Sequence, residues 1–232
     1  MIEHEVLDGC AIVRLARPPV NALDLSTVLA LEAVFAQLAV DGVKGLVLTG
    51  AGGVFSAGVD TRSFAGYSGA DKAALIRAIT RMIWRLYALP CPTVAAVSGH
   101  AMGGGLVLAL GCDVRICAPG DVRLGLTEAR AGVPFPTGPL EVIRAELPPE
   151  LLRRLTLTSA VLGPDEFLAR GVFDQIVAVD ELEARALATV ATLASQPAFA
   201  AVKQQLRAPT LERLERLAMP GDDPMVRMFN EV

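Results

Sequence analysis

Residues 92–105, PTVAAVSGHAMGGG, form an apolar strand-like run that breaks into glycine and then enters a helix-compatible stretch. Residues 45–60, GLVLTGAGGVFSAGVD, follow the same order with glycine after a strand-like run. Backbone N–H groups at such a break have no partner in the chain, so they can donate to an anion. Two of these donors that converge on one point would form an oxyanion hole.

The segments around these two stretches alternate between the two periodicities of secondary structure. Residues 5–15 are typical of strands around a turn at Asp8-Gly9, and Asp24 or Ser26 can cap a helix that ends near residue 41. A helix is predicted over residues 71–89, between strands at 45–49 and 92–98. Strands that alternate with helices of this length predict an α/β fold with right-handed crossovers.

After about residue 136 the pattern changes to amphipathic helices, with a further strand expected at residues 175–178. Helices are predicted at 138–146, 149–157, 164–169 and 181–194. Two separate helices follow, at 197–205 and 211–217. Residues 220–224, PGDDP, are expected to break the helix and to leave the carboxyl end loosely held.

Composition excludes several classes of protein. The 232 residues are 53% hydrophobic and carry a formal net charge of −4, without a basic stripe, which argues against nucleic acid as a partner. No apolar stretch reaches membrane-spanning length and the amino terminus is polar and acidic, so we expect a cytoplasmic protein without membrane association. The four cysteines lack metal-ligand spacing and are expected to be core residues, so no metal site is predicted.

Other glycine motifs fail at specific positions. The dinucleotide fingerprint that starts at Gly50 would need its third glycine where Phe55 stands, and the P-loop would need lysine after Gly58. A nucleophile elbow, Gly-x-Ser-x-Gly, is absent around both Ser56 and Ser98. These residues therefore favour main-chain anion binding over nucleotide binding or serine chemistry.

Several segments taken in order carry a resemblance to a known family. These are residues 17–24, FSAGVD at 55–60, AVSGHAMGGG at 96–105, Cys112-Asp113, LTEA at 126–129 and GVPFP at 132–136. Together they resemble the crotonase (enoyl-CoA hydratase/isomerase) family. The resemblance implies a crotonase-like ββα-type spiral core with a C-terminal helical region, and an acyl-CoA substrate of fatty acid metabolism. It implies no cofactor, since coenzyme A is part of the substrate.

The resemblance also implies an assembly and a division of the chain. Members of the family form trimers or pairs of trimers through C-terminal helices. We therefore expect a crotonase-like α/β core at residues 1–178, and a helical oligomerisation region at residues 179–232 of a homotrimer or dimer of trimers.

Site residues follow from the resemblance position by position. The N–H groups of Val59 and Gly104 would form the oxyanion hole, and Glu128 would be the catalytic acid and base. The remaining positions would bind the coenzyme A part of the substrate: Ala57, Asp60, Thr61 and Arg62 at the side of the pocket, and Ala22 and Leu23 beside the pantetheine.

The number of carboxylates bears on the reaction. Hydratases of the family use two glutamates, and the position of the first is Val107 here. One carboxylate suits the transfer of a proton between two carbons, which favours isomerisation of a 3-enoyl-CoA to a 2-enoyl-CoA. Apolar neighbours at 134–136 would raise the pKa of Glu128 toward neutrality. Enoyl-CoA hydration (a lyase reaction), another crotonase-type reaction and a non-catalytic acyl-CoA-binding subunit remain alternatives.

Overall fold

The structure is a computed structural model that describes residues 1–219 and 223–230. Its larger sheet has the strand order β1-β2-β3-β5-β7-β10. β1 and β2 pair antiparallel around the turn at Asp8-Gly9, and the other neighbours pair parallel. The bounds are β1 Ile2–Leu7, β2 Cys10–Leu15, β3 Gly45–Gly50, β5 Thr93–Val97, β7 Val114–Cys117 and β10 Gln175–Ile176.

A second, smaller sheet has the order β4-β6-β8-β9. Its strands are β4 Val54–Ser56, β6 His100–Met102, β8 Leu124–Gly125 and β9 Val161–Leu162. Each of the first three follows a strand of the larger sheet and precedes a helix, so the chain repeats a strand-strand-helix unit. This confirms the predicted ββα order, although the sequence did not reveal the smaller sheet as a separate element.

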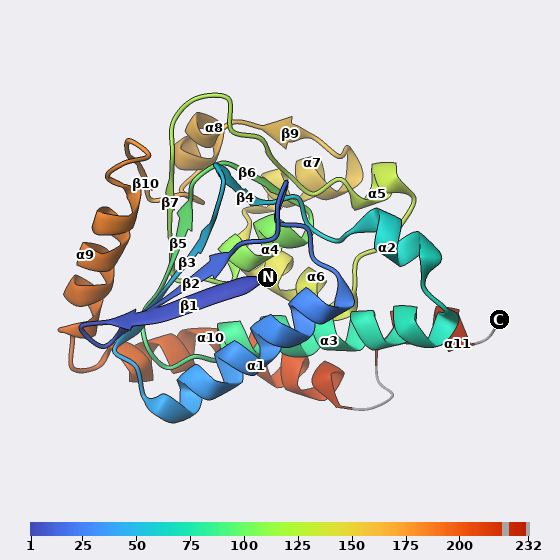
Figure 1. The fold of residues 1–232 in the computed structure, drawn as a ribbon, viewed down its shortest axis with the longest axis horizontal. Coiled ribbons are helices and arrows are strands. Elements are labelled where there is room, and N and C mark those ends of the chain that lie inside the picture. Colours follow the sequence, from blue (N-terminus) through green and yellow to red (C-terminus); the bar gives the residue numbers. More distant parts are fainter. Residues whose placement is uncertain (220–222, 231–232) are drawn as a thin grey trace.

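Helices surround the two sheets (Figure 1). They are α1 Leu25–Asp41, α2 Thr61–Gly66, α3 Gly69–Tyr87, α4 Gly104–Leu110, α5 Glu128–Ala131, α6 Thr137–Glu146, α7 Pro149–Leu157, α8 Pro164–Ala169, α9 Leu182–Ala194, α10 Phe199–Ala218 and α11 Pro224–Asn230. Of the two residues that could cap the first helix, Asp24 does so, and its side chain accepts from the N–H of Thr27. Gly42 ends that helix in the left-handed conformation.

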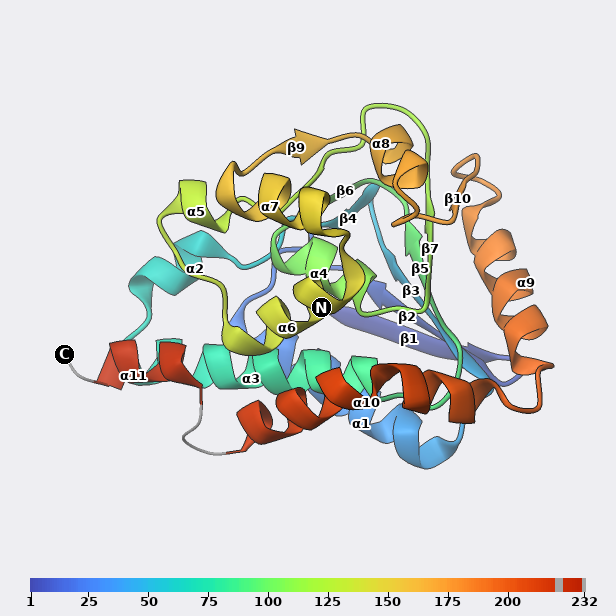
Figure 2. The same cartoon turned by 180° about the vertical axis from the view of Figure 1, so that it is seen from behind.

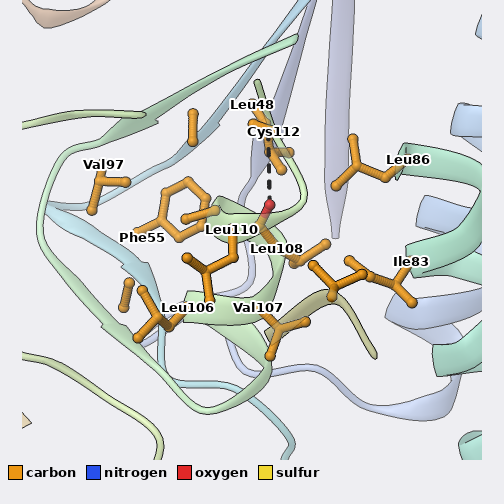
Figure 3. Packing of buried hydrophobic residues seen from close by; sticks show 14 of the residues in the cluster. Leu48, Phe55, Ile83, Leu86, Val97, Leu106, Val107, Leu108, Leu110 and Cys112 are labelled. Carbon is orange, nitrogen blue, oxygen red and sulfur yellow. Dashed lines mark hydrogen bonds between the residues drawn. The ribbon is translucent and has the colours of Figure 1, made fainter. Parts of the chain in front are cut away.

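The main core fills the space between the larger sheet and helices α1, α3 and α4. Figure 3 shows α4 inside this core, with Leu106, Leu108 and Leu110 surrounded by buried side chains such as Phe55 and Leu86. Because five of the seven α4 residues are apolar side chains that face this interior, the helix is held rigidly. The backbone at its amino terminus is therefore fixed in space.

The C-terminal helices pack onto the rest of the chain. α9 covers one face of the larger sheet, where Leu182, Ala186 and Val190 contact β-strand residues (Figure 2). α10 and α11 lie against α3. The division of the chain at residue 178 stays a prediction, and so does the role of these helices in oligomerisation.

Two expectations for the C-terminal part are wrong. α10 is one helix and continues through Pro209, where the sequence predicted an interruption. Proline removes one N–H from a helix interior, but α10 packs against α3 and α6, and Arg207 and Leu214, on either side of Pro209, are buried. The carboxyl end is not loosely held where it is described, because Met225 and Val226 are buried against α3; residues 220–222 and 231–232 lie outside the described residues.

In the described part of the chain, no helix has the length and apolar character needed to cross a membrane. Cys10, Cys112 and Cys117 are buried free thiols and Cys91 is half-buried, which confirms their prediction as core residues. Among the residues that the structure describes, no group of three or more His, Cys, Asp or Glu side chains could hold a metal ion.

Candidate active site

The two glycine segments approach each other closely through their main chains. A Cβ atom on Gly58 would lie 2.5 Å from the carbonyl oxygen of Met102 and 2.9 Å from the nitrogen of Gly104. Gly58 also has a φ of 80°, a conformation that residues with a side chain rarely adopt. Glycine is therefore needed here for both space and backbone conformation, and it brings residue 59 beside the start of α4.

The N–H groups of Val59 and Gly104 are both without a partner among the described residues. Leu23 forms a parallel bridge with Val59, in which Leu23 N–H donates to Gly58 O at 2.8 Å and Asp60 N–H donates to Leu23 O at 3.0 Å. This pattern turns the N–H of Val59 away from Leu23. Gly104 is the first residue of α4, so its N–H has no acceptor within the helix.

These two N–H groups border the same space. A Cβ atom on Gly104 would lie 3.9 Å from the nitrogen of Val59. Unpaired backbone donors of this kind are costly to bury unless an acceptor reaches them. The arrangement is therefore suited to binding one oxygen atom that carries partial negative charge.

Asn21 and Ser56, to which the sequence assigned no role, hold this loop in place. Asn21 has a φ of 51°, and its side-chain amide donates to the carbonyl oxygens of Ala51 at 2.9 Å and Val54 at 2.7 Å. Ser56 Oγ accepts from the N–H of Gly58 at 3.1 Å and donates to Asn21 O at 2.7 Å. A local signal was present, since asparagine is the residue type that most readily replaces glycine at positive φ.

The carboxylate of Glu128 lies beside the same helix end. Glu128 is the first residue of α5, and its Oε1 lies 3.0 Å from the position that a Cβ atom on Gly103 would take. Its Oε2 is buried and has no hydrogen-bond partner among the residues that the structure describes. Burial raises the pKa of Glu128 from its ordinary value to about 7, which is the direction that the apolar sequence predicted.

An apolar cavity of about 150 Å³ connects these groups. Its walls include side chains of α3, the segment 133–136 and Val107 of α4, and its lining contains Glu128 together with Val59, Gly103 and Gly104. Among the described residues that line the cavity, Glu128 is the one with a titratable side chain. Val107 presents an aliphatic side chain to the cavity, at the position where the resemblance gives hydratases the first of their two glutamates.

The other predicted binding residues are divided between the cavity and its surroundings. Leu23, Ala57 and Thr61 line the cavity, whereas Ala22, Asp60 and Arg62 do not. The Ala57, Thr61 and Arg62 side chains are exposed, and Ala22 is half-buried. His100 lies in β6, where its Nδ1 accepts from the N–H of Arg123 at 3.0 Å.

Asp60 caps helix α2 and pairs with Arg17. Its carboxylate accepts from the N–H groups of Arg62 and Ser63 at the start of α2, each at 3.1 Å, and pairs with Arg17 at 2.9 Å. The backbone hydrogen bond from Ser63, together with Arg17, lowers the pKa of Asp60 to about 2. Arg17 also donates to the carbonyl oxygen of Ala22 at 3.2 Å, so this network connects the loop at residues 17–24 to α2.

Glu128 makes the stability of the fold depend on pH. The folded chain retains the Glu128 proton up to about pH 7, whereas an unfolded chain releases it near the ordinary value of 4.5. The Glu128 contribution to stability is therefore lost as the pH rises through this window. Glu128→Gln is expected to raise the free energy of unfolding at pH 8 by on the order of 1–3 kcal/mol, with a smaller difference at pH 4.5.

Urea unfolding at several pH values measures this difference. The matched control is Glu150→Gln, because Glu150 is exposed on α7 and lies outside the cavity. A difference between wild type and Glu128→Gln that is the same at every pH would contradict the assigned pKa.

Comparison with known proteins identifies the relatives of this chain. The profile of the family described as enoyl-CoA hydratase/isomerase matches residues 5–229. The chain is 30% identical to human mitochondrial enoyl-CoA delta isomerase 1 over 219 residues, which cover 92% of this chain and 72% of that protein. It is 33% identical to a probable enoyl-CoA hydratase of Mycobacterium avium over 226 residues, which cover 96% of this chain and 87% of that protein.

Solved structures have the same fold. Human mitochondrial Δ3-Δ2-enoyl-CoA isomerase superposes with a TM-score of 0.88 at 29% identity, over 99% of this chain and 90% of that one. An enoyl-CoA hydratase/isomerase family protein of Pseudomonas syringae superposes with a TM-score of 0.85 at 26% identity, over 94% of both chains. The predicted crotonase-like α/β fold is therefore confirmed, and this chain belongs to the enoyl-CoA hydratase/isomerase family.

Proposed function

We propose that the protein isomerises a 3-enoyl-CoA to a 2-enoyl-CoA, with Glu128 as the sole acid and base. The observation that carries this proposal is the composition of the cavity, where Glu128 is the one titratable side chain among the described lining residues. It lies beside the start of α4, where the N–H of Gly104 has no partner in the described part of the chain. A human enoyl-CoA delta isomerase among the relatives supports the same reaction.

In the proposed reaction, the thioester oxygen accepts hydrogen bonds from the N–H groups of Val59 and Gly104. The Glu128 carboxylate removes a proton from carbon 2 of the acyl chain, and the electron pair moves toward the thioester oxygen to form a dienolate. Glu128 then returns the proton to carbon 4, so the double bond moves and the carboxylate is restored. A preorganised donor at a developing oxyanion contributes about 2.7–4 kcal/mol to transition-state stabilisation.

The burial of Glu128 suits this role. A pKa of about 7 leaves a substantial fraction of the side chain ionised at neutral pH, while the carboxylate is more basic than an exposed one. Val107 and the segment 133–136 surround the reacting carbons with apolar groups, which disfavours a bound water. Addition of water to a double bond requires such a water to be held and deprotonated.

Hydration nevertheless remains a second candidate, because a probable enoyl-CoA hydratase is among the relatives at 33% identity. A third candidate from a different class is a subunit that binds acyl-CoA without turnover. For the binding of coenzyme A we propose Ala22 and Leu23 beside the pantetheine and Ala57, Asp60, Thr61 and Arg62 at the mouth. The proposed reaction uses no cofactor, because the coenzyme A is part of the substrate.

We also propose that the protein forms a homotrimer or a dimer of trimers in the cytoplasm. Val202 and Leu206 lie four residues apart on α10 and are exposed to 57% and 80%, which supports an apolar contact surface there. Exposed apolar side chains one helical turn apart lie on the same helix face.

Two assays with the wild-type protein separate the three candidates. We expect turnover of a 3-enoyl-CoA to the 2-enoyl-CoA and little hydration of crotonyl-CoA, both followed by the change in ultraviolet absorbance. Hydration of crotonyl-CoA at a rate equal to the isomerisation would overturn the proposed reaction. Calorimetric binding of an acyl-CoA without turnover of either substrate would instead favour the binding subunit.

A further inference from the structure

Helix α11, near the carboxyl end of the chain, contributes a side chain to the cavity. Met225 is 6% exposed, packs against Ala73 and Ile76 of α3, and is part of the cavity lining. No sequence pattern placed this residue near the site, since it lies about a hundred residues after Glu128. The cavity wall is therefore completed by the last described helix.

A buried carboxylate fixes the position of this helix. Asp223 Oδ1 accepts from the N–H of Met225 and from Thr137 Oγ1, each at 2.9 Å, and Oδ2 accepts from Thr80 Oγ1 at 3.2 Å. Thr80 belongs to α3 and Thr137 begins α6. Asp223 thus caps α11 and joins it to two helices that also border the cavity.

The location of α11 shows which part of the cavity Met225 closes. In both ribbon views α11 lies beside the end of α3 that is near α2, away from α4 (Figures 1 and 2). Gly104 and Val107 line the cavity from α4, whereas Ile76 and Met225 line it from α3 and α11. The cavity therefore extends from the unpaired N–H groups toward the side chain of Met225.

We propose that Met225, positioned by Asp223, closes the acyl end of the cavity and limits the length of the acyl chain that the protein accepts. This proposal rests on the proposed function, in which the thioester oxygen binds at Val59 and Gly104. An apolar acyl chain that starts there runs along the aliphatic side chains of α3 and ends against Met225. Methionine is flexible, but here the start of its helix is anchored to α3 and α6 by Asp223.

The test measures the affinity of saturated acyl-CoA thioesters of increasing chain length by isothermal titration calorimetry. Met225→Ala removes three heavy atoms, so the chain length of maximal affinity is expected to increase by about two methylene groups. Each methylene group that enters the new space is expected to improve the affinity about fourfold. Met225→Phe is expected to shift the maximum toward shorter chains.

Met219→Ala is the matched control, because Met219 is 57% exposed and lies outside the cavity lining. It should leave the chain-length profile of the wild type unchanged. An unchanged affinity for the shortest acyl-CoA shows that each variant is folded. Profiles of Met225→Ala and Met225→Phe that both coincide with the wild-type profile would overturn the proposal.

The positioning role of Asp223 has its own variants. Asp223→Ala removes the acceptor of three hydrogen bonds and is expected to shift the chain-length maximum in the same direction as Met225→Ala. Asp223→Asn retains a side-chain oxygen and is expected to restore the wild-type profile. A loss of affinity by Asp223→Ala that is equal for all chain lengths would contradict the positioning role.

The binding measurement also separates this proposal from the proposed function. If the wild type binds acyl-CoA and the Met225 variants shift the profile, the length limit stands even when no 3-enoyl-CoA is converted. If 3-enoyl-CoA is converted but the profile does not shift, the reaction stands and the length limit is wrong.

Discussion

Glu128→Gln is expected to lower kcat for the conversion of a 3-enoyl-CoA to a 2-enoyl-CoA by about 10²–10⁴-fold. Glutamine retains the shape of the side chain beside Gly103 but cannot accept the proton from carbon 2. The effect should lie toward the upper end of this range, because no other titratable side chain lines the described part of the cavity. Steady-state kinetics with one 3-enoyl-CoA substrate measure the loss.

Two further measurements make the result specific. The kcat/KM of the wild type should rise with pH through about 7 and then level off, because the carboxylate form of Glu128 is the active one. Affinity for a saturated acyl-CoA should change little in Glu128→Gln, since the proposed oxyanion donors remain. Glu150→Gln, an exposed control on α7, should retain full activity. A Glu128→Gln enzyme as active as this control would disprove the proposed mechanism.

Asp113→Ala is expected to lower the free energy of unfolding by about 3–5 kcal/mol. Asp113 Oδ2 accepts from Lys203 Nζ at 2.7 Å, and Oδ1 pairs with Arg207 at 3.0 Å. Both cations are about 5% exposed, and desolvation by burial lowers the pKa of Lys203. Removal of the carboxylate would leave two buried positive charges without their counterion.

The remaining contacts of this cluster explain why the loss should be large. Lys203 also donates to the carbonyl oxygen of Cys91 at 2.8 Å, and Arg207 donates to that of Tyr87 at 3.0 Å. The Arg207 guanidinium lies 3.8 Å from the centre of the Tyr87 ring. These contacts attach α10 to the core. Without the Asp113 carboxylate, Lys203 and Arg207 would repel each other and loosen the attachment of the helix.

Urea unfolding of three variants checks this prediction. Asp121→Ala is the matched control, because Asp121 and Arg123 are both exposed and form a surface ion pair at 3.8 Å. It should change the stability little. Replacing Lys203 and Arg207 with methionine in the Asp113→Ala chain should recover much of the loss, because no charge then remains buried. Equal stability losses for Asp113→Ala and Asp121→Ala would show that the buried cluster contributes no more than a surface pair.

Much of the site was visible in the sequence because it is made from main-chain groups. Gly58 and Gly104 mark the two segments whose backbones meet, and Val107 and Glu128 stand at positions that bear on the chemistry. The smaller sheet was not visible as such, because strands of two or three residues are too short to show a period. The two separate helices predicted at 197–205 and 211–217 are one helix, α10, because packing along the helix outweighs the hydrogen bond lost at Pro209.

The sequence by itself determined the α/β order, the start of the first helix at Asp24 or Ser26 and the two glycine segments, because each depends on the conformation of neighbouring residues. Only the tertiary structure decided which distant side chains meet. Asp113 and Lys203 are 90 positions apart, and Thr80 and Asp223 are 143 apart. Local patterns carry no information on such pairs, since their contact depends on how the helices pack after the chain has folded. The buried cluster under α10 and the closure of the cavity by Met225 both arise in this way.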